Sequence, residues 1–402
     1  MVSQRRLAIL ATHPVQYQCP LWARVAQAAG ITVKVFFGSD FSIRGYSDTG
    51  FATQVAWSRR LLNGFDHVFT GQRDWHPVFF RGGRRLFAEL AAFAPTDMLL
   101  NAYLPLFNVQ GLRWARKRRV RVHFRGDTTD VDRDRGPLVS LFRNAVLRWV
   151  YSQVDTFCAV GCHSRAHYLA RGIEDRRIFD SPFCVDTDAF ERLYHQQRLR
   201  RSDLRSSWDL GKEDFVLVFS GKLIPKKDPL AVISAVASVP TLGNRVVKLL
   251  VAGDGPLRDA CQTKARERCA GRVRFLGFTS QEDLAAVYTA GDALVLPSLR
   301  SETWGLVVNE ALQCGLPCVV SDRVGCIDDL ILAGATGESF RAGDVSGLRA
   351  ALVRLAGWLD GRREEVAARC RERVSRYSLD AAAAGIVRAV LHEDDAPSPH
   401  RP

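Results

Sequence analysis

Two glutamates placed eight positions apart, Glu302 and Glu310, stand on either side of a glycine in the stretch SETWGLVVNEALQCGLPCVV. The apolar spacing after Gly305 predicts a short helix, with the first glutamate in the loop before it and the second inside it. The backbone N–H groups of Leu306 and Val307 would then be unpaired first-turn donors, which suit a phosphate group. Carboxylates accept hydrogen bonds from hydroxyl groups. The stretch therefore predicts a binding site for a sugar nucleotide.

Three further segments of the second half place polar or small residues directly after predicted strands. In SGKLIPKKDP, Lys222 and Lys227 could neutralise a diphosphate, and a solvated turn is the alternative. In VAGDGPL, Gly253 lies in a strand-to-helix turn, and forming that turn is its first expected role. In GFTSQEDL, Phe278 lies in the loop before a helix that Ser280 could cap. Together these segments predict a ligand site built from loops.

Polar residues also follow two predicted strands of the first half. In ATHPVQYQC and in HFRGD these residues are His13, Gln16, Tyr17, His123, Arg125 and Asp127. Ligands of open α/β sheets bind at the carboxyl ends of the strands, so these side chains are candidates for a cleft or an acceptor site. For His123 the alternative is a side chain that points into the sheet, because neighbouring residues of a strand face opposite ways.

The motifs follow short Val- and Leu-rich strands that alternate with helices in two series, at about 5–171 and 214–321. A less regular region at 41–77 is expected to form loops and a hairpin. An amphipathic helix is expected at 379–391. Alternation of this kind predicts an α/β fold with two parallel sheets, each covered by helices on both faces.

The run ETWGLVVNEALQCGLP resembles the E-x7-E signature of the retaining glycosyltransferases of family 4, and the resemblance extends from Lys222 to about Asp344. It implies the GT-B fold, in which two Rossmann-like parallel-sheet domains face each other across a cleft. An acceptor-binding domain is then expected at 1–195 and a nucleotide-sugar-binding domain at 205–375. A helix at 376–393 would return to the first domain, and the tail at 394–402 would be disordered.

The resemblance also implies roles for the site residues. Glu310 would accept hydrogen bonds from the ribose hydroxyls, and Glu302 would contact hydroxyls of the transferred sugar near the reaction centre. Lys222 and Lys227 would hold the donor phosphates, and the backbone near Phe278 would hold the nucleobase. Enzymes of this family need no metal or other cofactor, which agrees with the lack of a D-x-D motif near the phosphate segment.

The chain departs from the family pattern in two places. Lys222 stands where the family usually has an arginine, so the bidentate fork is lost while the charge is kept. In the segment DRVGCIDD, Cys326 replaces a second glycine and Asp329 replaces the usual glutamate. We expect these positions to weaken the family's donor contacts.

The motifs HPVQYQ and RGD of the first half are similar to a subset of the family from bacterial polysaccharide clusters. This resemblance implies that Asp127, Arg125 and His123 act beside Glu302 as catalytic or acceptor-side residues. The expected function is transfer of a hexose from a UDP- or GDP-sugar to a glycan or lipid-linked acceptor, in cell-envelope or exopolysaccharide synthesis. Another GT-B activity, a nucleotide-sugar epimerase or a phosphorylase, is the alternative.

The net charge of +13 belongs almost entirely to the first half of the 402 residues. Residues 1–200 hold 29 Lys and Arg against 17 Asp and Glu, with the densest cluster, RWARKRRVRVHFR, at 113–125. Such a field favours an anionic membrane surface, a phosphorylated acceptor or nucleic acid. Because no known nucleic-acid-binding motif accompanies the charge, no nucleic-acid partner is expected. A non-catalytic protein that binds anionic surfaces is a second alternative.

The ten cysteines are scattered and form no C-x2-C pair, which argues against a zinc site and favours a reducing compartment. No apolar run approaches the roughly 20 residues that a membrane-spanning helix needs. The first apolar run is expected to be a buried strand rather than part of a signal peptide. These features predict a cytoplasmic protein, and the basic first half together with the family resemblance adds a peripheral position on the inner face of the cell membrane.

Overall fold

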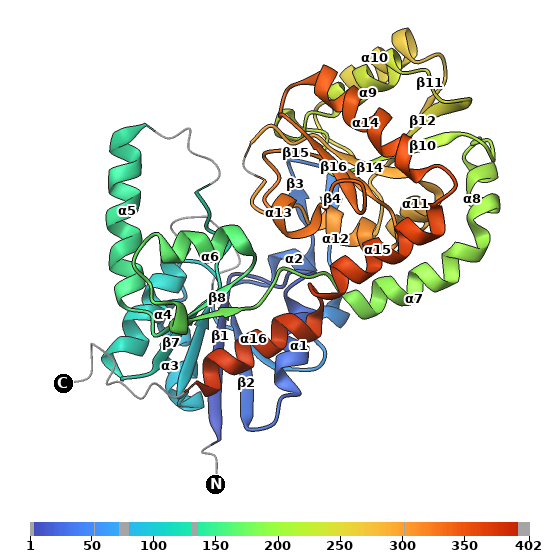
Figure 1. Cartoon of the computed structure of the whole chain (residues 1–402). Helices are drawn as coiled ribbons and strands as arrows, with labels where there is room; N and C mark the ends of the chain where they lie inside the picture. The colour runs from blue at the N-terminus through green and yellow to red at the C-terminus, as the bar shows by residue number, and fades with distance from the viewer. Residues whose placement is uncertain (1–3, 52, 72–79, 131–135, 301, 393–402) are drawn as a thin grey trace. The chain divides into compact units, whose positions relative to one another are not determined.

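The computed structural model describes residues 4–51, 53–71, 80–130, 136–300 and 302–392, which form two units (Figure 1). Unit 1 comprises 1–46, 55–186 and 379–402, and unit 2 comprises 47–54 and 187–378. The main division therefore falls at 186–187, before the boundary expected at 195–205. The segment Ser47–Gln54, expected in the first domain, groups with unit 2. The tail at 394–402 lies outside the described residues.

Unit 1 is built on a parallel sheet whose described strands follow the order β5-β2-β1-β6-β7-β8-β9. These strands are β1 (Arg5–Ala11), β2 (Ile31–Phe37), β5 (Asp66–Phe69), β6 (Asp97–Leu100), β7 (Arg121–Phe124), β8 (Thr156–Ala159) and β9 (Ile178–Asp180). Its helices are α1 (Cys19–Ala26), α2 (Phe41–Arg44), η1 (Arg59–Leu62), α3 (Gly83–Phe93), α4 (Leu106–Lys117), α5 (Pro137–Ser152), α6 (Cys162–Leu169), η2 (Asp175–Arg177) and α16 (Leu379–Leu391).

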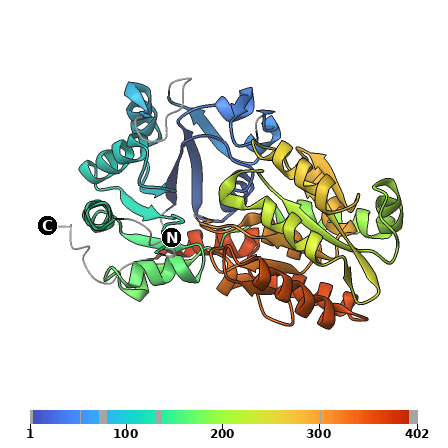
Figure 2. The same cartoon turned by 90° about the horizontal axis from the view of Figure 1, so that it is seen from above.

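Helices cover both faces of this sheet, which explains why its strands are apolar in continuous runs rather than in alternation (Figure 2). On one face, buried side chains of α3, α4, α5 and α6 form a core with strands β6, β7 and β8. On the other face, α1 and α16 pack against β1 and β2. The expected alternation of strands and helices is thus confirmed for this unit.

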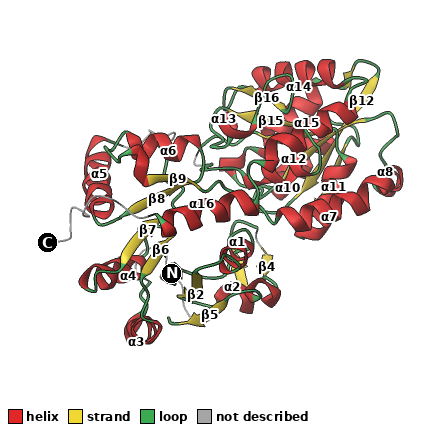
Figure 3. Ribbon diagram, turned by 60° about the horizontal axis from the view of Figure 1, so that its bottom comes forward, coloured by secondary structure: helices red, strands yellow, loops and turns green. Residues whose placement is uncertain are grey.

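The last helix of the described chain, α16, completes unit 1 and lies alongside α1, β8 and β9 (Figure 3). The Ser181 hydroxyl donates to the backbone oxygen of Ala382 over 2.8 Å. Gly385 marks the closest approach to β9, since a Cβ atom there would lie 2.0 Å from the carbonyl oxygen of Asp180. The absence of a side chain at this position therefore lets the helix reach the sheet.

Unit 2 has a second sheet, with described strands in the order β11-β12-β10-β14-β15-β16 and with β13 beside β12. All its pairs are parallel except β11 with β12. The strands are β10 (Phe215–Ser220), β11 (Thr241–Leu242), β12 (Arg245–Ala252), β13 (Val273–Gly277), β14 (Ala293–Leu296), β15 (Cys318–Ser321) and β16 (Gly337–Phe340). The helices are α7 (Thr187–Gln197), η3 (Arg198–Arg200), α8 (Arg201–Ser207), η4 (Pro225–Lys227), α9 (Pro229–Ser238), α10 (Arg258–Arg268), α11 (Gln281–Ala290), α12 (Leu306–Gln313), α13 (Ile327–Leu330), α14 (Val345–Leu359) and α15 (Arg363–Ser375).

The region 41–77 is more regular than expected in its described part. It contains α2, η1 and the two-stranded sheet of β3 (Tyr46–Asp48) and β4 (Thr53–Val55). It also contains β5, which pairs with β2 at one side of the first sheet. Across the described ranges no helix is both long enough and apolar enough to cross a bilayer.

Candidate functional site

The loops that carry the predicted donor residues leave neighbouring strands of unit 2. Lys222 follows β10, Gly253 follows β12, Phe278 follows β13 and Glu302 lies in the loop after β14. Because β13, β12, β10 and β14 are adjacent and parallel, these loops emerge at the same edge of the sheet. The structure thus brings residues 80 positions apart in the sequence to one site.

The turn at Gly253 depends on the absence of a side chain. Its φ of +152° lies in a region that favours glycine, and a Cβ atom would lie 1.9 Å from the carbonyl oxygen of Gly221. The turns after β10 and β12 therefore touch through their backbones. This explains how Lys222 comes to lie beside the second turn.

Helix α12 begins at Leu306, directly after Gly305, whose φ of +100° is left-handed. The first-turn amides of Leu306 and Val307 therefore lie at the helix N-terminus that the sequence predicted to bind phosphate. Glu302 lies in the preceding loop, with its side chain 12% exposed. That loop is fixed by the N–H of Gly325, which donates to the backbone oxygen of Glu302 over 2.9 Å.

The carboxylate of Glu302 is held by a cation and a hydroxyl. The Lys227 ammonium pairs with its Oε2 atom, and the Ser298 hydroxyl donates to the same oxygen over 2.9 Å. Lys227 was predicted to contact donor phosphates, whereas here its charge neutralises a glutamate. The three side chains form one charged cluster beside the N-terminus of α12.

Glu310 lies in the middle of α12 and makes a hydrogen bond that the sequence did not predict. The Tyr288 hydroxyl donates to Oε2 of Glu310 over 2.7 Å and lies 3.1 Å from the Ser220 hydroxyl. Tyr288 is 1% exposed, so it fixes the glutamate from inside the unit. Burial raises the pKa of Glu310 to about 7, against the effect of this hydrogen bond.

The raised pKa of Glu310 predicts a pH-dependent effect of Glu310→Gln on stability. The folded state holds this proton more tightly than the unfolded chain, so the glutamate's favourable contribution is complete below pH 4.5 and is lost as the pH rises to about 7. Between pH 4 and pH 8 the difference in the free energy of unfolding between Glu310→Gln and the wild type should therefore shift in favour of the variant by about 3 kcal/mol. Thermal unfolding at a series of pH values measures the difference. A difference that does not vary with pH contradicts the assignment.

A segment of the sequence's first half contributes to this site. The Asp48 carboxylate, at the end of β3, lies 2.8 and 2.9 Å from the Lys222 ammonium. The amides of Gly50 and Phe51 donate to the same carboxylate. Burial alone would raise the pKa of Asp48, but the bonds from Lys222 and these amides bring it below its ordinary value. The cation predicted to bind diphosphate thus already has an internal anion.

The same segment adds an aromatic ring. Phe51 lies edge-on to Phe278, with ring centroids 5.1 Å apart, and the Lys222 ammonium is 4.9 Å from the centre of the Phe51 ring. Asp48, Phe51 and Tyr288 are the residues that sequence reasoning missed. A contact between residues more than 170 positions apart leaves no spacing pattern in the sequence. The local signal for Asp48 and Phe51 was the turn-forming triplet at 48–50 followed by an aromatic residue.

In unit 1 the first-strand motif forms a small polar group at the end of β1. The His13 ring accepts or donates a hydrogen bond with the Thr12 hydroxyl at 2.9 Å, and burial lowers its pKa to about 4, so it is neutral at pH 7. Burial raises the pKa of Tyr17 to about 12, and the nearby charge of Asp127 acts in the same direction. Gln16 is half-buried and Asp127 is exposed. The Tyr17 ring lies edge-on to Phe183, whereas His13 packs on Phe41.

Two catalytic candidates of the sequence, His123 and Arg125, are buried and bonded to groups of unit 1. His123 is fully buried, and its ring nitrogens lie 2.7 Å from the Thr156 hydroxyl and 2.9 Å from the Asp97 carboxylate. These partners enclose the ring within unit 1, so the geometry does not support the predicted contact with substrate. Arg125 is 4% exposed and donates to the backbone oxygens of Ser181 and Pro182, so it holds the chain after β9.

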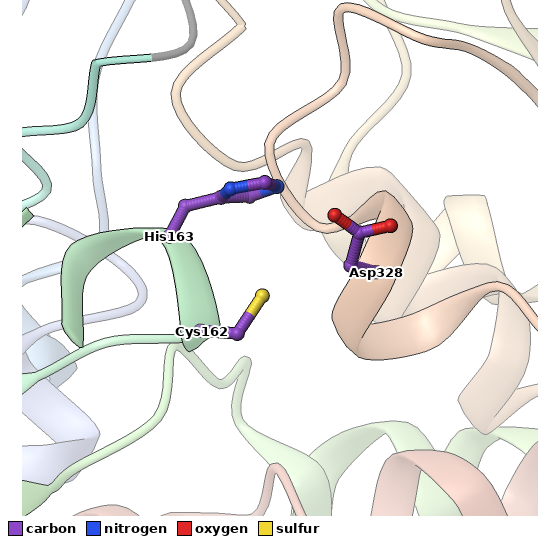
Figure 4. A group of neighbouring side chains, drawn as sticks. All are labelled: Cys162, His163 and Asp328. Atoms are coloured by element: carbon purple, nitrogen blue, oxygen red, sulfur yellow. The ribbon is translucent and has the colours of Figure 1, made fainter. Parts of the chain in front are cut away.

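Cys162 and His163 begin α6 in unit 1, and Asp328 belongs to α13 in unit 2 (Figure 4).

Asp329, which stands where a glutamate was usual, is 6% exposed and accepts a hydrogen bond from the Tyr377 hydroxyl over 3.0 Å. Its carboxylate therefore supports α13.

Comparison with known proteins finds a family match within unit 2. Residues 200–373 match the family model of glycosyl transferases group 1. The chain is 30% identical over 218 residues to N-acetyl-alpha-D-glucosaminyl L-malate synthase of Bacillus anthracis, which covers 53% of each protein. It is 33% identical over 209 residues to D-inositol 3-phosphate glycosyltransferase of Actinosynnema mirum, covering 48% of this chain and 49% of that protein. The chain thus spans about half the length of the curated relatives it matches.

Solved structures are similar over nearly the whole chain. A glycosyltransferase from Rickettsia africae superimposes with a TM-score of 0.72 at 12% identity, covering 98% of this chain and 100% of that one. HepE from Anabaena, solved in complex with UDP, gives a TM-score of 0.70 at 16% identity, covering 96% and 99%. These likenesses confirm the expected GT-B fold with two Rossmann-like sheets.

Proposed function

We propose that this chain, whose residues 200–373 match the family model of the group 1 glycosyl transferases, is a retaining glycosyltransferase. It moves a hexose from a nucleotide diphosphate sugar to a hydroxyl of a glycan or lipid-linked acceptor. The observation that carries the proposal is the edge of the second sheet, where the loops after β10 and β14 bring Lys222 and Glu302 to the side from which α12, with Glu310, begins. The proposal includes no metal ion or other cofactor.

The donor would lie with its diphosphate at the start of α12. The first-turn amides and the cations Lys222 and Lys227 supply positive potential there, and they would stabilise the charge that develops on the leaving group. Asp48 and Glu302 already pair with these cations. On binding, the donor's phosphates would therefore have to displace these carboxylates as well as water from the two ammonium groups. Glu310 would accept bonds from the ribose hydroxyls, and Phe278 would lie at the nucleobase.

The acceptor would bind on unit 1, where Gln16, Tyr17 and Asp127 follow β1 and β7. The basic character of this unit favours an acceptor that carries phosphate. We propose a lipid-linked acceptor of cell-envelope or exopolysaccharide synthesis, with the protein on the cytoplasmic face of the membrane. A front-face displacement, in which the leaving phosphate helps to deprotonate the acceptor hydroxyl, accounts for retention without a protein nucleophile.

Thermal unfolding with UDP, GDP, ADP, CDP and dTDP, each with and without common sugars attached, tests the donor site. One nucleotide should raise the melting temperature as its concentration rises, because it binds the folded state. Glu310→Ala should bind that nucleotide about tenfold more weakly, since a charged hydrogen-bond acceptor is lost. Slow hydrolysis of the same donor should release the sugar with its anomeric configuration retained. No shift with any nucleotide, or an inverted product, would overturn the proposal.

A further inference from the structure

Helix α5 carries two apolar stripes on opposite sides. One stripe faces the core of unit 1, where Leu147, Val150 and Tyr151 are almost fully buried. The other faces solvent, and its large side chains follow the helical spacing i, i+3, i+4 and i+11. These residues, with their exposed fractions, are Leu138 (80%), Leu141 (70%), Phe142 (73%) and Trp149 (42%).

This outer stripe differs from ordinary surface exposure of single apolar residues. With Val139, which is 59% exposed, it places four large apolar side chains in the first two turns of one helix. Soluble proteins seldom expose apolar groups together in this way unless another surface covers them. Since the opposite stripe already anchors α5 to the core, the outer stripe adds nothing to the packing of unit 1.

Positive charge lies beside the Trp149 end of the stripe. Arg148 is exposed on α5 itself, and the Arg113 guanidinium of α4 lies 5.7 Å from the centre of the Trp149 ring. The C-terminal end of α4 exposes Lys117, and Arg118 and Arg119 follow it. Neither helix contains an Asp or Glu. The covering surface must therefore combine an apolar interior with negative charge at its boundary.

We propose that the outer stripe of α5, Leu138 to Trp149, docks this protein on an anionic lipid bilayer. The leucines and Phe142 would insert among the acyl chains, Trp149 would lie at the headgroup level, and the cations of α4 would face the lipid phosphates. This inference rests on the membrane attachment in the proposed function and identifies the surface that makes the attachment. Vesicle binding by this surface does not depend on transfer activity.

A second copy of the chain is a poorer occupant of the same surface. Pairing two such stripes would bring Arg113, Arg148 and their equivalents of both copies together without a compensating acid on either helix. A bilayer that contains anionic lipid supplies the opposite charge as well as the apolar phase.

Flotation of the full-length protein with vesicles tests the docking surface. The wild type should bind vesicles of phosphatidylcholine with one third phosphatidylglycerol, bind pure phosphatidylcholine more weakly, and lose affinity as salt rises. The double variant Leu141→Ser/Phe142→Ser should bind the anionic vesicles at least about tenfold more weakly. Leu199→Ser is the matched control, because Leu199 is 83% exposed in unit 2 and should not affect binding.

Two outcomes would overturn the inference: wild-type protein that stays with neither vesicle, or a double variant that floats like the wild type. A dimer in solution that the double variant converts to monomer, without vesicle binding, would assign the stripe to a second copy instead. The nucleotide-dependent rise in melting temperature, measured without vesicles, should be the same in all variants. Its loss would concern the proposed function and not the docking surface.

Discussion

Replacing Glu302 by glutamine is expected to lower kcat for sugar transfer by about 10² to 10³-fold, the scale seen when a polar group that acts on the reaction centre is lost. The substitution keeps the size of the side chain and can still accept a bond from Ser298. It removes the charge that pairs with Lys227. The freed ammonium can then attract a diphosphate, so the affinity for the nucleotide should stay equal or increase.

Steady-state kinetics and nucleotide titration of the same preparation separate these two effects. Glu365→Gln serves as a control, because Glu365 belongs to an exposed ion-pair group on α15, far in sequence from the site loops. If Glu302→Gln keeps the wild-type kcat, the glutamate does not act on the transferred sugar. If it loses nucleotide affinity as well as activity, its role is in building the loop before α12.

Replacing Lys222 by methionine is expected to weaken binding of the nucleotide diphosphate by about 30 to 100-fold, since a charged hydrogen bond to phosphate is lost. The flexible apolar chain of methionine can still pack against Phe51. The variant also leaves the Asp48 carboxylate without its cation, although the amides of Gly50 and Phe51 still bind it.

The partner of Lys222 supplies a variant with the opposite expectation. Asp48→Asn removes the internal anion that competes with phosphate, so it should bind the nucleotide as tightly as the wild type or more tightly. Calorimetric titration measures the affinity of both variants for the nucleotide. Weaker binding by both variants to the same degree would mean that the Lys222–Asp48 contact positions the segment and does not compete with the donor.

Much of the fold follows from local pattern. Helices α9 and α11 follow clear local signals, because α9 begins at Pro229 and the Ser280 hydroxyl caps α11. The strand β5 was missed, since DHVF is short and contains two polar residues. Its place beside β2 is a tertiary contact that no local signal states.

The site residues also divide into those that local pattern predicts and those that only tertiary contacts place. Motifs that follow strands could be placed together because parallel strands bring their carboxyl ends to one edge. The direction of the His123 side chain could not be predicted from the sequence. Successive residues of a strand face opposite sides of the sheet, but the strand sequence does not reveal which side carries a partner such as Asp97. Asp48 joins the site through a hairpin inserted far upstream, so only three-dimensional structure reveals it.

The position of α16 has a consequence for synthesis on the ribosome. Unit 1 begins at the N-terminus but receives α16 only after the whole of unit 2, residues 187–378, has been translated. Until then the core that α16 completes, which includes Cys158 of β8 and Cys184 after β9, lacks part of its cover. Domains generally fold as units as they emerge, and incomplete ones expose apolar surface. A nascent chain stalled before residue 379 should therefore hold a folded unit 2 beside an unfinished unit 1.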